Sequence, residues 1–150
     1  RGLTVLRMTC SSRGCRVESP DYSFTLNADE RVAHLLSLKP KATGRLILVG
    51  SSMGGYVSTV ASATLQPAGL FLLAPAFFIP GYQQQSPTPC AAQTAIVHGW
   101  NDEVVPVDNS IRFARTHRVR LHLLDGDHRL TDCLPQIERL FSVFLEEVLG

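Results

Sequence analysis

Short apolar runs alternate with helix-like segments along this 150-residue chain. Most of the runs are continuous rather than alternating in polarity, which is typical of parallel strands covered on both faces. The runs lie at residues 3–6, 46–49, 70–73, 95–97 and 119–124. Helical patterns lie at residues 28–38, 53–65, 107–116 and 134–148. The second of these segments consists of small and weakly polar residues. Strands that alternate with helices predict an α/β protein with three layers, α/β/α, around a mainly parallel sheet.

The last helical segment has the most regular pattern. Apolar residues recur from Leu134 to Val148 at three- and four-residue steps, with charged side chains opposite. We expect Thr131 or Asp132 to cap this helix and Pro135 to lie in its first turn. In the preceding helix, the expected buried side carries Val107, Ile111 and Ala114.

The length fits a single domain over residues 1–150, because a chain of this size buries roughly 68–70% of its unfolded surface. Its longest irregular stretch is residues 74–92, which is rich in proline and glutamine. Loops of this length in a compact domain are usually functional or disordered. The segment is therefore either a lid or pocket wall or a disordered loop, and the sequence leaves both open.

Charge and composition argue against several classes of function. The formal net charge is only +1, whereas nucleic-acid binders normally carry a clustered basic excess. The longest uncharged apolar stretch, residues 68–83, contains two prolines and is too short to span a bilayer. No secretory leader opens the chain, so we expect reduced thiols and a cytoplasmic location. We also expect no metal site, because no metal-binding spacing links the four cysteines, Cys10, Cys15, Cys90 and Cys133. Nothing in the sequence indicates an oligomeric state.

A glycine-rich turn follows the second apolar run. Residues 50–54 form G-x-S-x-G with Ser52 at the centre, between a predicted strand and a predicted helix. A serine in such a sharp turn points beyond the carboxyl edge of the sheet, and Gly50 and Gly54 are expected where side chains would clash. The turn lacks the lysine of a phosphate loop and the G-x-G-x-x-G of a dinucleotide site. A flavodoxin-like nucleotide binder with a similar element order is a further alternative.

A serine becomes nucleophilic only beside a base that an acid orients. His128 lies between the last strand and the last helix, where the base belongs if the order is Ser, acid, His. Asp102 follows the fourth run and is the best-placed acid, and its neighbour Glu103 could substitute. Asp125 and Asp127 are expected to shape the turn before His128. We expect structural or surface positions for the other four histidines, His34, His98, His117 and His122. His98 is expected to be a hydrogen-bonded residue at the end of a strand.

Three motifs together resemble the α/β-hydrolase superfamily, and more narrowly small bacterial esterase-like proteins with a G-S-S-x-G-G-Y elbow. The elbow spans residues 50–56, H-G-x-x-D-x-x-V-P spans residues 98–106, and G-x-H spans residues 126–128. The resemblance covers nearly the whole chain. It implies Ser52 as nucleophile, His128 as general base and Asp102 as orienting acid, with the backbone N–H of Met53 as an oxyanion donor.

The front of the chain departs from this family. Its members usually begin with a strand that ends in a His-Gly loop and supplies a second oxyanion N–H, and no such strand precedes Arg1. Loss of one oxyanion donor typically costs about 10²–10³ in turnover. We therefore expect an N-terminally short fold and a natural protein that begins before Arg1. If the chain does begin at Arg1, we expect weak or absent hydrolysis even with all three residues in place.

The hypothesis from sequence is a serine hydrolase that cleaves a carboxylic ester or thioester through an acyl-enzyme, without a cofactor. Its expected partner is a small-molecule ester or acyl substrate in a pocket lined by Phe77, Phe78 and Trp100. A non-catalytic protein of the same fold that binds a ligand or partner is the alternative.

Overall fold

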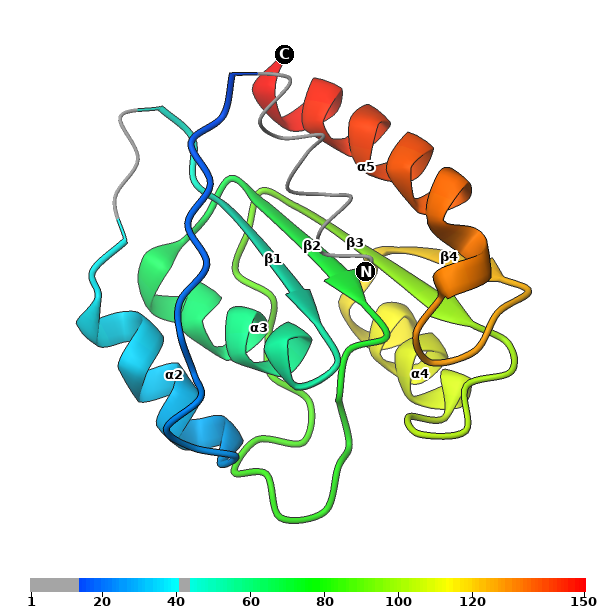
Figure 1. Cartoon of the computed structure of the whole chain (residues 1–150), viewed down its shortest axis with the longest axis horizontal. Helices are drawn as coiled ribbons and strands as arrows, with labels where there is room; N and C mark the ends of the chain where they lie inside the picture. The colour runs from blue at the N-terminus through cyan, green and yellow to red at the C-terminus, as the bar shows by residue number, and fades with distance from the viewer. Residues whose placement is uncertain (1–13, 41–43) are drawn as a thin grey trace.

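Residues 14–40 and 44–150 are described by the structure, a computed structural model of the chain. Within them, four parallel strands form one sheet in the order β1-β2-β3-β4 (Figure 1). The strands are β1 (Ile47–Ser51), β2 (Gly69–Leu73), β3 (Gln93–Gly99) and β4 (Arg120–Leu124). The four apolar runs from residue 46 onward are thus confirmed as parallel strands. The run expected at residues 3–6 lies outside the described residues.

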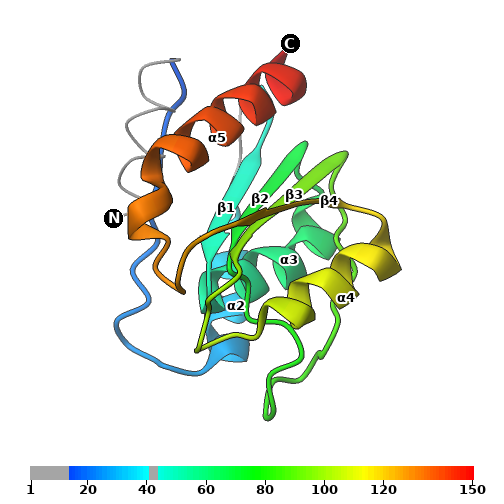
Figure 2. The same cartoon turned by 90° about the vertical axis from the view of Figure 1, so that its right-hand side faces the viewer.

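Helices cover both faces of the sheet. Three of them, α2 (Ala28–Ser37), α3 (Met53–Leu65) and α4 (Val107–His117), lie on one face, and α5 (Leu134–Leu149) lies on the other (Figure 2). The three-layer prediction is therefore confirmed. Among the helices that the structure describes, none has the length and apolarity that a bilayer crossing requires.

Successive residues of the central strands face opposite layers. Leu70, Leu72 and Ile96 pack toward α2, α3 and α4, whereas Phe71 and Val97 pack toward α5. All five side chains are fully buried. Burial on both faces is why these strands have unbroken apolar sequences. The sheet's carboxyl edge, where the loops described below begin, is thus held by packing on two sides.

The helix α5 is amphipathic as predicted, but it starts in a different way. A short 3-10 turn, η1 (Thr131–Cys133), leads into it, and Pro135 lies in its first turn. Cys133 takes the N-cap position without a side-chain hydrogen bond. The prediction that Thr131 or Asp132 caps the helix is wrong, because the 3-10 turn carries the chain into the helix instead of a polar cap.

The helix α4 buries Ala114 as predicted, but the rest of its buried side differs from the predicted one. Val107 and Ile111 are only half-buried, whereas Ser110, Phe113 and Ala114 are buried. Phe113 is the largest apolar side chain of this helix and has the most surface to remove from water. Its burial sets the rotation of the helix and brings the Ser110 hydroxyl to the inner side.

The connection between β2 and β3, residues 74–92, is irregular throughout, as predicted. Asp29 and Tyr56 hold its middle part: Asp29 Oδ2 accepts the Gln83 N–H at 3.2 Å, and the Tyr56 hydroxyl accepts the Gln84 N–H at 3.2 Å. The same hydroxyl donates to Asp29 Oδ1 at 2.7 Å. Burial and then this hydrogen bond raise the pKa of Tyr56 to about 12, so the phenol keeps its proton. The loop is thereby fastened to α2 and α3.

Candidate active site

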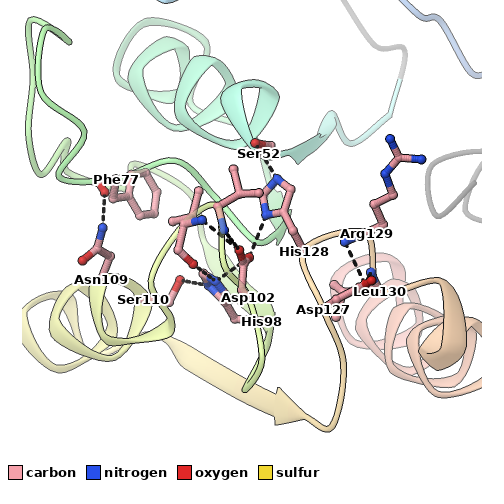
Figure 3. A network of polar contacts seen from close by, with 12 residues as sticks. Ser52, Phe77, His98, Asp102, Asn109, Ser110, Asp127, His128, Arg129 and Leu130 are labelled. Carbon is pink, nitrogen blue, oxygen red and sulfur yellow. Dashed lines mark hydrogen bonds and ion pairs between the residues drawn. The ribbon is translucent and has the colours of Figure 1, made fainter.

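Three polar side chains meet beyond the carboxyl ends of the strands. Ser52 directly follows β1, Asp102 lies in the loop after β3, and His128 lies in the loop after β4 (Figure 3). Open α/β sheets place their sites at this edge. The structure thus brings together the three residues that the sequence motifs single out.

Two hydrogen bonds join these three side chains in a continuous series. The Ser52 hydroxyl lies 3.0 Å from His128 Nε2, and His128 Nδ1 lies 2.7 Å from Asp102 Oδ2. An ionised carboxylate can only accept, so Nδ1 carries the proton and Nε2 accepts from the hydroxyl. The His128 side chain is 20% exposed, so the ring is not sealed in the core.

Asp102 is buried and fully hydrogen-bonded. Its side chain is 0% exposed, and its Oδ1 accepts the N–H groups of Val104 and Val105, both at 2.8 Å. Its Oδ2 contacts His128 and also His98 Nε2, at 3.0 Å. Burial alone raises the pKa of this carboxyl, but the hydrogen bonds from His128, Val105 and Val104 outweigh it and hold the pKa below its usual range. Asp102 is therefore an ionised carboxylate that can orient His128.

Ser52 occupies a strained backbone conformation. Its φ of 55° and ψ of −119° lie in a region that is costly for a residue with a side chain. The surrounding backbone holds it there: its N–H donates to Leu73 O at 2.9 Å, and its carbonyl accepts the N–H groups of Gly55 at 3.0 Å and Ala76 at 2.9 Å. The N–H of Met53, at the start of α3, has no hydrogen-bond partner within the described part of the chain.

Close backbone contact requires glycine at positions 50 and 55. A Cβ on Gly50 would lie 2.1 Å from the Gly54 oxygen, and a Cβ on Gly55 would lie 2.8 Å from the Pro75 Cβ. A Cβ on Gly54 would meet nothing within 4 Å. The predicted clash at Gly54 is therefore wrong, because only the backbone of that residue takes part in the close approach.

The loops that carry Asp102 and His128 are joined through backbone contacts. The Asn101 N–H donates to Gly126 O at 2.9 Å. Gly99 passes so near that a Cβ on it would lie 2.2 Å from the same oxygen. A shift of either loop would therefore disturb the other, so the position of Asp102 is tied to that of His128.

The other acids near His128 have different partners. Asp127 Oδ1 accepts two backbone N–H groups of its own turn, at 3.1 and 3.0 Å, and Asp125 Oδ1 accepts from the Asn101 side chain at 2.9 Å. Both shape or fasten the turn, as predicted. Glu103 is exposed to solvent. Among these candidates, Asp102 is the acid on the His128 ring.

The three predicted pocket residues lie in different surroundings. Phe77 is 0% exposed and stacks on Phe113 with ring centroids 3.9 Å apart, so it is a core residue and the pocket expectation does not fit it. The half-buried Phe78 ring lies 4.1 Å from the Arg112 guanidinium. Trp100 is 54% exposed in the loop that carries Asp102. Of the three rings, that of Trp100 is the most exposed. It lies in the loop that carries Asp102, which with Ser52 and His128 is called the triad below.

No set of three or more His, Cys, Asp or Glu side chains in residues 14–40 and 44–150 could hold a metal ion. A hollow of about 830 Å³ lies at the other edge of the sheet, where its lining includes Arg45, Gln66 and Ala91. These residues precede β1, β2 and β3, whereas the three polar side chains follow the strands. The hollow is therefore separate from the candidate active site.

Solved structures with this arrangement match nearly the whole chain. A protein of Xanthomonas campestris pv. campestris assigned to the α/β hydrolase superfamily is 27% identical, with a TM-score of 0.85 over 97% of this chain and 90% of that one. This chain itself therefore has the α/β-hydrolase fold. Est1E of Butyrivibrio proteoclasticus is 18% identical with a TM-score of 0.82, over 99% of this chain and 82% of its own. An α/β serine hydrolase homologue of Coxiella burnetii is 20% identical with a TM-score of 0.75, over 96% and 76%. No protein-family model and no curated protein matches the sequence.

One polar neighbour of the triad in this α/β-hydrolase fold, His98, is not among the site residues that the sequence predicts. His98 is a hydrogen-bonded residue at the end of β3, as the sequence predicts, but its ring also contacts Asp102. The four-residue spacing of H-G-x-x-D is the signal that could have linked the two. A role for His98 could not follow from that spacing alone, because the loop conformation decides whether the side chains meet.

Proposed function

We propose that this protein is a serine hydrolase that cleaves a carboxylic ester or thioester through an acyl-enzyme intermediate. The observation that carries the proposal is the unbroken line of hydrogen bonds from Ser52 through His128 to the buried Asp102 carboxylate. A nucleophile, a base and an orienting acid in this geometry are what acyl transfer requires.

In the first half of the reaction, Ser52 Oγ attacks the acyl carbonyl while His128 Nε2 takes the hydroxyl proton. The carbonyl oxygen becomes an oxyanion, and the free N–H of Met53 at the start of α3 is placed to donate to it. When the intermediate collapses, the bond to the alcohol or thiol breaks and His128 returns the proton to that leaving group. The acyl group stays on Ser52 as an ester.

In the second half, a water molecule takes the place of the alcohol. His128 Nε2 removes its proton, the resulting hydroxide attacks the acyl carbonyl, and Ser52 leaves with the proton that His128 returns. Asp102 stays ionised throughout and stabilises the imidazolium that forms twice in the cycle. The products are a carboxylic acid and an alcohol or thiol.

The surface beside the triad favours an apolar or aromatic acyl group. Trp100 and Val104, which flank Asp102 in its loop, are 54% and 65% exposed. Est1E, whose fold is similar at 17% identity, is known with ferulic acid bound. An aromatic acid on that relative supports an ester or thioester of an apolar acid as the substrate class here.

Hydrolysis of 4-nitrophenyl esters of increasing acyl length, and of the matching thioesters, tests this function. The protein is expected to release nitrophenol or thiol faster than the Ser52→Ala variant, which keeps the fold and loses the nucleophile. A burst equal to the enzyme concentration is expected where deacylation is slow. Equal rates for the two proteins on every substrate would contradict the proposal and favour the non-catalytic alternative.

A further inference from the structure

A second imidazole contacts the acid of the triad. His98 is 0% exposed at the end of β3, and its Nε2 lies 3.0 Å from Asp102 Oδ2 and 3.0 Å from the Val105 carbonyl oxygen. Its Nδ1 lies 2.6 Å from the Ser110 hydroxyl on α4. His98, Asp102 and Ser110 lie side by side in Figure 3. Both ring nitrogens of this buried histidine therefore have polar partners.

The partners fix which nitrogen of His98 carries the proton. Both neighbours of Nε2 are oxygens that can only accept, so Nε2 must be the donor. Nδ1 then accepts from the Ser110 hydroxyl, which can act as a donor. Burial lowers the pKa of His98 below its usual value, against the opposing effect of the Val105 carbonyl and Asp102. The ring is therefore neutral near pH 7 and contributes an N–H group rather than a charge.

This N–H lies beside the Asp102 carboxylate and is shared between two acceptors, the Val105 carbonyl oxygen and Asp102 Oδ2. Oδ1 accepts two backbone N–H groups, Oδ2 accepts one N–H from His128, and Oδ2 also lies 3.0 Å from His98 Nε2, whose single N–H donates to the Val105 carbonyl as well. These three hydrogen bonds and the His98 contact fix both the plane and the position of the carboxylate. Removing the His98 donor would leave Oδ2 held only by the residue that Asp102 is meant to orient.

We infer that His98 is a positioning residue of this site, whose Nε2–H, shared between the Val105 carbonyl and Asp102 Oδ2, fixes the carboxylate so that it holds His128 in line with Ser52. The inference rests on the proposed hydrolase function for its effect on rate, and on geometry alone for the hydrogen bond. An apolar residue would fill a buried strand position equally well without a polar group to satisfy. Contact with Asp102 gives the histidine a specific use.

The kinetic test compares two substitutions of similar size. In His98→Gln, a side-chain amide N–H replaces Nε2–H as a donor to Oδ2, whereas His98→Leu removes the donor. H98L is expected to lower kcat by about 10- to 100-fold, because displacing a catalytic group by about 1 Å costs on that order. KM is expected to stay within about threefold, and H98Q is expected to recover most of kcat. His122→Leu, a histidine on the adjacent strand β4, is the control and is expected to keep the wild-type kcat.

Stability is measured on the same samples, since both substitutions alter a buried site. Rates are compared per folded molecule, after thermal unfolding has given the folded fraction of each variant. A kcat for H98L equal to that of the wild type would overturn the inference. An equal loss of kcat in H98Q and H98L would also overturn it, because packing rather than the donor would then matter.

Nuclear magnetic resonance gives a readout that does not need turnover. With 15N-labelled histidine, His98 is expected to show a protonated Nε2 and an unprotonated Nδ1 at pH 7. The His128 Nδ1–H resonance, which reports its bond to Oδ2, is expected to persist in H98Q and to move or broaden in H98L. The opposite tautomer of His98 would overturn the inference even in an active enzyme. The expected tautomer in a protein that hydrolyses no ester would support the His98–Asp102 bond and count against the proposed function alone.

Discussion

Replacing Gly50 by alanine would place a methyl group inside the backbone of the next turn. The new Cβ would lie 2.1 Å from the Gly54 oxygen, 2.4 Å from its carbonyl carbon and 2.7 Å from the Gly55 nitrogen. Real Cβ atoms essentially never come closer than 3.0 Å to a heavy atom outside their own residue and its two chain neighbours. All three neighbours are backbone atoms, so no side chain can rotate away. The start of α3 must therefore move by about 1 Å relative to β1.

This movement has consequences for both stability and turnover. Overpacking of this kind typically costs about 1–3 kcal/mol in the free energy of unfolding. Ser52 lies between Gly50 and the helix, and its hydroxyl is 3.0 Å from His128 Nε2. A displacement of about 1 Å at a reacting group costs on the order of 100-fold in rate. Gly50→Ala is therefore expected to lose about 100-fold in kcat/KM as well as stability.

Gly54→Ala is the matched control within the same turn. Its Cβ would meet nothing within 4 Å, and the residue lies in the first turn of α3. Alanine favours a helix over glycine by up to about 1 kcal/mol. Gly54→Ala is therefore expected to unfold at the same or a slightly higher denaturant concentration than the wild type. Urea unfolding followed by circular dichroism, with ester hydrolysis on the same samples, measures both quantities. The steric argument fails if Gly50→Ala matches the wild type in stability and rate, or if Gly54→Ala is the more damaged variant.

Three further predictions concern the acid, the core and the pH dependence of stability. Asp102→Asn should lower kcat by about 10⁴-fold with little loss of fold, because an amide N–H facing Nδ1 of His128 forces the wrong tautomer of that histidine. Kinetics on folded protein check this, and a wild-type kcat would refute it. Phe113→Ala should cost about 3–5 kcal/mol in urea unfolding, because it empties a fully buried ring site, and a loss below 1 kcal/mol would contradict the packing described here. Burial lowers the folded-state pKa of three histidines, so the unfolded chain binds more protons as the pH falls below about 6.5. The free energy of unfolding should therefore fall as the pH is lowered from 7 to 5, by at most about 1.4 kcal/mol per pH unit for each histidine. A rise in the free energy of unfolding over this range would contradict the lowered pKa values of His98, His117 and His122.

Local sequence patterns predict the elements of this fold well. Strands β1 to β4 and helices α2 to α5 all lie at predicted positions, because each strand is buried on both faces and each helix has a clear apolar side or a small-residue composition. The order of Ser52, Asp102 and His128 also indicates the site, since each residue follows a parallel strand. Parallel strands bring their carboxyl ends to one edge.

The features that the sequence does not predict depend on contacts between distant segments. Phe77 is adjacent to loop residues near the site, yet its stacking on Phe113 takes it into the core. The need for glycine at Gly55 comes from Pro75, on another segment. His98 reaches Asp102 only because the loop after β3 folds back over the strand end. None of these contacts leaves a periodic signal in the chain.

Covalent labelling of Ser52 tests the central claim most directly. A fluorophosphonate reacts with a serine only when a neighbouring base activates it, and intact-mass and peptide analysis locate the adduct. One adduct on the peptide that contains Ser52 is expected, with none in Ser52→Ala and far slower labelling in His128→Gln. A folded wild-type protein that takes up no label, or one labelled equally in Ser52→Ala, would contradict the account.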